Sequence, residues 1–133
     1  MRRGQVAMEF VAACMLLILV WTAFSMLSGE WNKKTYAVAA SADAQALLEK
    51  IHGEAVDAKA AGAGYSHAFT IPQALAGNAN YSIGIYPAQA TIETMFKDSS
   101  ASIVLPFSSF GGSIVCCTVK VTNENGNVMF SQE

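Results

Sequence analysis

Residues 10–28 read FVAACMLLILVWTAFSMLS, a run of 19 residues without a charged side chain. At 1.5 Å per residue, an α-helix of this length is about 28 Å long, close to the thickness of a bilayer's hydrocarbon core. Two arginines, Arg2 and Arg3, precede the run, and Glu9 stands directly before its first residue, Phe10. The run therefore predicts a hydrophobic transmembrane helix with a basic leader.

This segment differs from an ordinary secretory signal. Such a signal has an apolar stretch of about 7–15 residues followed by a small-residue cleavage site. Here the run is longer, and no such site follows it. Basic residues meet a small residue only before the run, at Arg3-Gly4. Cleavage there would remove residues 1–4 as a leader peptide and keep the apolar helix, beginning at Gln5.

The order of these residues resembles the class III signal peptide of archaeal type IV pilins. A basic leader that ends in Arg3-Gly4 is followed by Gln5, then by Glu9-Phe10, then by an apolar helix. The resemblance implies that a prepilin peptidase cuts between Gly4 and Gln5, which makes Glu9 the fifth residue of the mature chain. It covers the leader and residues 5–28.

What the resemblance implies is a structural protein. The chain would be held in the cytoplasmic membrane as a precursor and would assemble into an extracellular type IV pilus-like filament, a homopolymer with surface adhesion as its expected role. The implied partners are copies of itself, a prepilin peptidase, an assembly ATPase and a membrane platform protein.

Two alternatives stay open. One is a minor pilin or a TadE-like pseudopilin. TadE-like helices usually contain a proline, whereas the first proline here is Pro72. The other is a single-pass membrane-anchored binding module with an extracellular β domain that never polymerises.

We expect Gln5, Glu9 and Phe10 to serve assembly. A carboxylate at the bilayer centre costs about 3 kcal/mol on insertion scales, and Glu9 lies only about 6 Å along the helix from Gln5. Cleavage before Gln5 would create an α-amine with a pKa of about 8, which is mostly protonated at neutral pH. The amine of one subunit could then pair with Glu9 of the next. In an uncut anchor, Glu9 would instead extend to the interface beside Arg2 and Arg3.

Charge and cysteine content exclude other classes. Without Arg2 and Arg3, six basic side chains face ten acidic ones, a net charge of −4. This balance, without a basic stripe, argues against nucleic-acid binding. Three cysteines do not make a disulfide framework. Cys116 and Cys117 are adjacent in a strand-like segment and point to opposite faces, so they are poorly placed to bond each other. Cys14 lies in the apolar run. All three cysteines are therefore interpreted as small apolar side chains.

Helical signals continue beyond the apolar run. No proline interrupts residues 30–61, and residues 37–61 contain ten alanines, the strongest helix former. Gly62 and Gly64 are typical of a helix end. The sequence predicts one helix over residues 5–62, with two helices broken at Gly29 as the alternative. An apolar stripe at helical spacing is expected to cover one sheet face: Leu47, Leu48, Ile51 and Ala55.

Residues 65–133 have the character of a β-rich globular head. All three prolines lie here. Near the end of the segment, Asn125-Gly126 lies between two apolar runs, which is the strongest short hairpin signal. We expect five or six short strands in an antiparallel sheet or a small β-sandwich, with residues 108–113 as flexible linkage. The predicted fold class is α+β, with the long helix and β head of a pilin. The period-two runs are Phe69 and Ile71; Tyr81, Ile83 and Ile85; Ile92, Thr94 and Phe96; Ile103, Leu105 and Phe107.

Few residues could carry chemistry in this chain. His52 and His67 lie in different predicted elements without ligand-like spacing, so we expect no metal, no cofactor and no catalytic residue. Asn80-Tyr81-Ser82 fits the acceptor pattern for N-glycosylation, which would place Asn80 on the outer side of the membrane. The protein is therefore expected not to be an enzyme.

Overall fold

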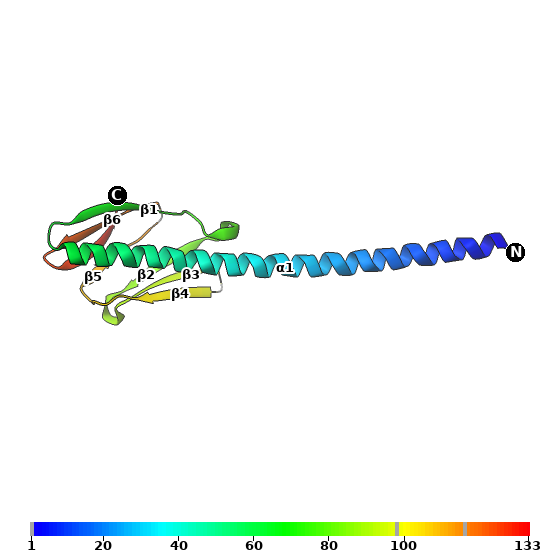
Figure 1. Cartoon of the computed structure of the whole chain (residues 1–133), viewed down its shortest axis with the longest axis horizontal. Helices are drawn as coiled ribbons and strands as arrows, with labels where there is room; N and C mark the ends of the chain where they lie inside the picture. The colour runs from blue at the N-terminus through cyan, green and yellow to red at the C-terminus, as the bar shows by residue number, and fades with distance from the viewer. Residues whose placement is uncertain (1, 98, 116) are drawn as a thin grey trace. The chain divides into compact units, whose positions relative to one another are not determined.

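The computed structural model describes residues 2–97, 99–115 and 117–133, and within α1 it describes side chains from Ala7 onward. One long helix is followed by two β-sheets (Figure 1), so the predicted α+β class is confirmed. The chain forms two compact units, one up to Ala37 and the other Val38–Glu133. Cys116, which was expected to be a small apolar side chain, lies outside the described residues.

Helix α1 runs over Arg2–Ala61. It passes through Gly29 without a break, so the prediction of one helix is confirmed and the two-helix alternative is wrong. The helix begins within the predicted leader and ends one residue before the predicted Gly62. Gly62 has a φ of 84°, a left-handed conformation that favours glycine and stops the helix.

The C-terminal part of α1 buries one face against the sheets. The predicted stripe is confirmed, since Leu47, Leu48, Ile51 and Ala55 are all buried. The spacing of three and four residues places these side chains on one side of the helix. The stripe is longer than the sequence indicated, and small residues extend it at both ends: Ala40, Ala44 and Ala58.

Within the described residues, seven strands form the two sheets, more than the five or six expected. The first sheet has the order β1-β6-β7-β5 and the second β2-β3-β4. Short 3₁₀ turns, η1 (Ala76–Asn78) and η2 (Pro87–Gln89), flank β2. The strands are β1 (Ser66–Ile71), β2 (Tyr81–Tyr86), β3 (Thr91–Phe96), β4 (Ser99–Val104), β5 (Phe110–Gly112), β6 (Cys117–Glu124) and β7 (Asn127–Gln132).

The period-two runs occupy strands much as expected. Alternate residues of β3 are buried, namely Ile92, Thr94 and Phe96. The predicted run at residues 103–107 is wrong in part, because β4 ends at Val104. Pro106 has no backbone N–H and cannot donate a hydrogen bond to a neighbouring strand. Leu105 is nevertheless buried.

The Asn125-Gly126 hairpin is confirmed. Strands β6 and β7 pair antiparallel up to Glu124 and Asn127, so the two residues between them form the loop. Asn125 and Gly126 have φ values of 53° and 90°, as the tight turn that matches strand twist requires. The Gly126 N–H also donates to the Asn123 side-chain oxygen at 2.8 Å.

Asn123 joins this hairpin to the end of α1. Its side chain is 2% exposed, and its Nδ2 donates to the Ala58 carbonyl at 2.8 Å. The carbonyls of a helix's last turn lack partners within the helix, so this bond satisfies one of them. Lys59 adds a second link, since its Nζ donates to the Gly126 carbonyl at 2.6 Å and to Ser109 Oγ at 2.7 Å. The helix end is thus fixed by polar contacts as well as by packing.

Strand β5 corrects the expectation that residues 108–113 are flexible linkage. It pairs with β7 in the parallel direction, with Gly112 opposite Phe130. Gly112 has a φ of 110°, and a Cβ added there would lie 1.9 Å from the Phe130 carbonyl oxygen. Only glycine allows this approach, so Gly112 permits a strand here rather than a free loop.

We predict that Gly112→Ala destabilises the β unit by about 3 kcal/mol or more, because the new Cβ must displace the β7 backbone. That loss would lower the unfolding midpoint of a unit this size by about 10 °C or more. Calorimetry of the full chain in detergent measures the change. Gly111→Ala is the matched control, since a Cβ there would meet nothing closer than Met129 Sδ at 3.7 Å. Equal midpoints for the two variants would contradict the prediction.

Candidate membrane and assembly segment

The apolar segment, residues 10–28, is exposed on every side of α1. Four consecutive side chains, Leu16 to Leu19, are 65%, 69%, 63% and 68% exposed. Consecutive residues of an α-helix point about 100° apart, so these four cover the whole circumference. A helix that is apolar all round belongs in a membrane or in the core of a larger assembly. By length and composition, α1 from Ala7 can cross a bilayer.

Hydroxyl groups within the segment are satisfied by the helix itself. Ser25 Oγ donates to the Trp21 carbonyl and Ser28 Oγ to the Phe24 carbonyl, both at 2.9 Å. Thr22 does the same with Leu19. Side chains bonded in this way bring no unsatisfied donor into an apolar medium. These hydroxyl bonds were not predicted, although serine and threonine within an apolar helix are a signal for them.

Glu9 and Phe10 lie at the start of the apolar segment. Both side chains are exposed, and from Ala7 to Gly29 the carboxylate of Glu9 is the only charged group. Within the described part of the chain, this carboxylate has no ion-pair partner. The backbone of Arg3, Gly4 and Gln5 is helical, whereas their side chains lie outside the description. The proposed processing and pairing roles therefore remain predictions.

The candidate glycosylation site is accessible. Asn80 is exposed and directly precedes β2, and Ser82, the second required residue of the acceptor triplet, is exposed on that strand. Exposed Asn80 and Ser82 side chains at the start of an edge strand leave room for a bulky glycan. Attachment of a glycan remains a prediction.

The two histidines do not lie in one cluster of ligand-type residues. His67 Nδ1 lies 3.4 Å from Glu54 Oε2, a contact between β1 and α1, and His52 is half-buried on α1. Among the described residues, no group of three histidine, cysteine or carboxylate side chains could hold a metal ion.

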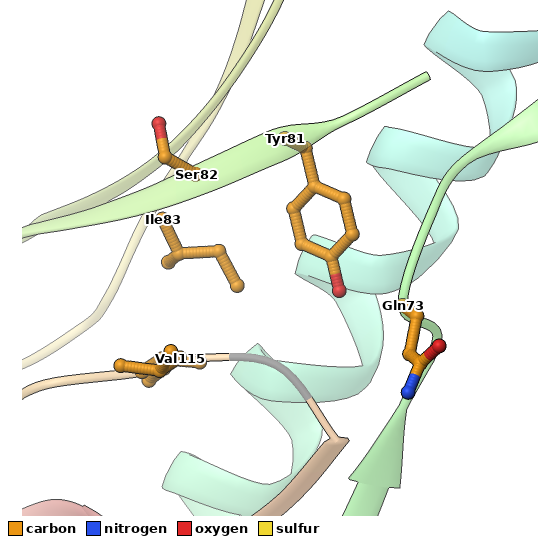
Figure 2. A pocket seen from close by; sticks show the side chains of 6 residues that line it. Gln73, Tyr81, Ser82, Ile83 and Val115 are labelled. Atoms are coloured by element: carbon orange, nitrogen blue, oxygen red, sulfur yellow. The ribbon is translucent and has the colours of Figure 1, made fainter. Parts of the chain in front are cut away.

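A shallow pocket of about 280 Å³ lies between β2 and the residues before β6. Figure 2 shows Ile83 and Val115 on one side of β2 and Ser82 directed away from them. The Tyr81 side chain projects from the same side of β2 as Ile83, and its hydroxyl donates to the Pro72 carbonyl. Gln73 Nε2 donates to Cys117 Sγ at 3.4 Å. Because the polar groups that line the pocket are engaged or point elsewhere, they do not converge on one ligand position.

Comparison with protein-family models, with curated proteins and with solved structures gives no match to this chain. The functional argument therefore depends on the apolar segment and on Glu9.

We predict that Ile18→Lys weakens membrane insertion. Ile18 is 63% exposed, so a lysine there would be harmless to a helix in water. At the centre of a bilayer-spanning helix, a lysine costs about 3 kcal/mol. Alkaline extraction of membranes measures insertion, and Gln45→Lys, on the exposed face of α1 in the other unit, is the control. Equal retention of both variants in the membrane would contradict the prediction.

Proposed function

We propose that this chain is a structural subunit of an extracellular type IV pilus-like filament, made as a membrane-held precursor and polymerised through its apolar N-terminal helix. The observation that carries this proposal is the apolar segment, which is exposed all round. Such a surface needs lipid before assembly and neighbouring helices afterwards. The role is structural, with surface adhesion as the expected use of the filament.

Glu9 favours a polymer over a plain anchor. Lipid tails are about as apolar as the segment itself, so hydrophobic burial alone does little to move the helix out of a membrane. A specific polar interaction must help. Cleavage after Gly4 would give each subunit an α-amine at Gln5, about one turn from its own Glu9, and neighbouring subunits could then pair these charges.

The second unit, Val38–Glu133, has its own core and a fixed helix end, as a head exposed to the medium requires. Its core joins α1 to both sheets, and the bonds of Asn123 and Lys59 fix the helix end to the β6–β7 hairpin. Asn80 lies on its surface as a candidate for glycosylation. In the proposed assembly this unit faces the medium, while a prepilin peptidase, an assembly ATPase and a platform protein act on the precursor.

A single-pass anchored binding module is the competing function, and the length of the apolar segment fits a plain anchor equally well. The two proposals differ in what Glu9 does. In an anchor its carboxylate only has to reach the interface, whereas in a filament it has a partner in the next subunit.

We predict that Glu9→Ala yields processed protein in the membrane and little or no filament outside. Removing one member of a buried charge pair leaves the other unpaired, which typically costs about 3–5 kcal/mol and less where water reaches it. Even the lower cost, repeated at each added subunit, would stop or slow growth. Insertion should survive, because alanine suits an apolar helix. Quantifying the subunit in sheared extracellular material measures the effect.

Glu49→Ala is the matched control, because Glu49 is an exposed carboxylate on the same helix but in the other unit. This variant should assemble normally. If Glu9→Ala also gave normal filaments, Glu9 would be a tolerated interfacial carboxylate and the pairing mechanism would be wrong. If neither variant nor the unchanged chain gave filaments, the anchored module would replace the proposed function.

A further inference from the structure

We propose that Trp31, Lys33, Lys34 and Tyr36 form a collar that seats α1 in the phospholipid headgroup layer at the outer end of the apolar segment. All four side chains are exposed, with Trp31 at 71% and Tyr36 at 59%. The proposal rests on the membrane-held precursor of the proposed function and is independent of the filament. It adds a lipid-contacting site beyond the apolar run itself.

The collar surrounds the helix. At about 100° per residue, Trp31 and Lys34 lie about 60° apart, and so do Lys33 and Tyr36. The two aromatic–lysine pairs occupy opposite sides of α1, so headgroups on either side of the spanning helix meet an aromatic ring and a cation. Along the axis the collar extends about 7.5 Å, similar to the headgroup layer of one leaflet.

Its distance from Glu9 matches a bilayer. From Glu9 to Trp31 the helix advances by about 33 Å, against a hydrocarbon core of about 30 Å. When the collar lies in the outer headgroup layer, Glu9 therefore reaches the inner one. Both ends of the apolar segment are then anchored at polar interfaces, and residues 10–28 between them carry no charge.

The chemistry of the collar suits phospholipid headgroups. Tryptophan and tyrosine are enriched at membrane interfaces because one end of each ring system is apolar and the other polar. Within the described residues, neither lysine lies within 4.0 Å of a carboxylate, so both ammonium groups are available to lipid phosphates. Thr35 Oγ1 donates to the Trp31 carbonyl at 2.9 Å and so adds no unsatisfied donor.

The chain contains its own depth markers. Its two tryptophans are Trp21 and Trp31. Trp21 lies about 18 Å along the helix from Glu9 and about 15 Å from Trp31, so the collar places it near the bilayer centre. The proposal therefore assigns a different depth to each indole.

The test uses the full chain in vesicles of phosphatidylcholine and phosphatidylglycerol in equal parts. Trp21→Phe leaves Trp31 as the only indole, and Trp31→Tyr leaves Trp21 while keeping an interfacial aromatic residue. Lipids brominated near the headgroup or near the chain end quench the fluorescence of each variant. We expect the shallow quencher to act more strongly on Trp31 and the deep quencher more strongly on Trp21.

A second comparison tests whether the cations of the collar help to set that depth. In the Trp31→Tyr background, Lys33→Gln combined with Lys34→Gln removes both charges and keeps an aromatic ring at positions 31 and 36. The quenching profile of Trp21 should shift toward the shallow probe or broaden, because the helix is no longer fixed by its ammonium groups. Lys97→Gln with Lys120→Gln removes the same charge from the other unit and should change nothing.

Each outcome decides a separate claim. A chain that inserts, but whose Trp31 is quenched best by the deep probe, overturns the collar and leaves the membrane span standing. An unchanged Trp21 profile after loss of Lys33 and Lys34 also overturns the role assigned to the cations. A chain that does not enter vesicles at all overturns the span in the proposed function, and the collar with it.

Discussion

The apolar surface of residues 10–28 is the constraint on which the rest of the molecule depends. Twelve large apolar side chains of this segment are exposed. Burying each one is worth about 1.5–3 kcal/mol, so together they drive the helix out of water by roughly 20–35 kcal/mol. This exceeds the about 5–15 kcal/mol by which a typical domain is stable. The segment must therefore be covered, and lipid or other copies of the helix are the media that cover all its sides.

The same helix meets two different requirements along its length. In residues 10–28 it is apolar all round, whereas from Ala40 onward only one face is buried and the other carries polar groups such as Gln45 and Glu49. The second part serves as a core element of the β unit, and the bonds from Asn123 and Lys59 fix its end. A continuous helix thus contains both the membrane-compatible segment and a core element of the β unit.

Local patterns in the sequence predicted most of the fold. The uninterrupted helix, the stripe through Leu48 and Ile51, the period-two strands and the Asn125-Gly126 hairpin each depend on residues close together in the chain. What the sequence did not indicate depends on distant partners. Strand β5 exists only because Gly112 lets its backbone meet β7, and Asn123 acts on Ala58, 65 residues away. Contacts between such distant residues produce no periodic pattern in the sequence.

The candidate site was predictable for a related reason. The order of charges, the length of the apolar run and the position of Glu9 all belong to one short segment. The apolar helix and its acidic start could therefore be predicted directly from the sequence. The hydroxyls of Ser25 and Ser28, bonded to their own helix, became apparent only with the backbone in place. The proposed pairing of Glu9 with another subunit would involve a second chain, which a single sequence does not describe.

The most direct test of the central claim is the mass of the subunit in fibres sheared from the cell surface. The account predicts abundant chains that begin at Gln5, because cleavage after Gly4 releases the leader and leaves the apolar helix to polymerise. Recovery of the chain solely from the membrane fraction, with Met1, Arg2 and Arg3 intact, would contradict the account and identify the segment as a permanent anchor.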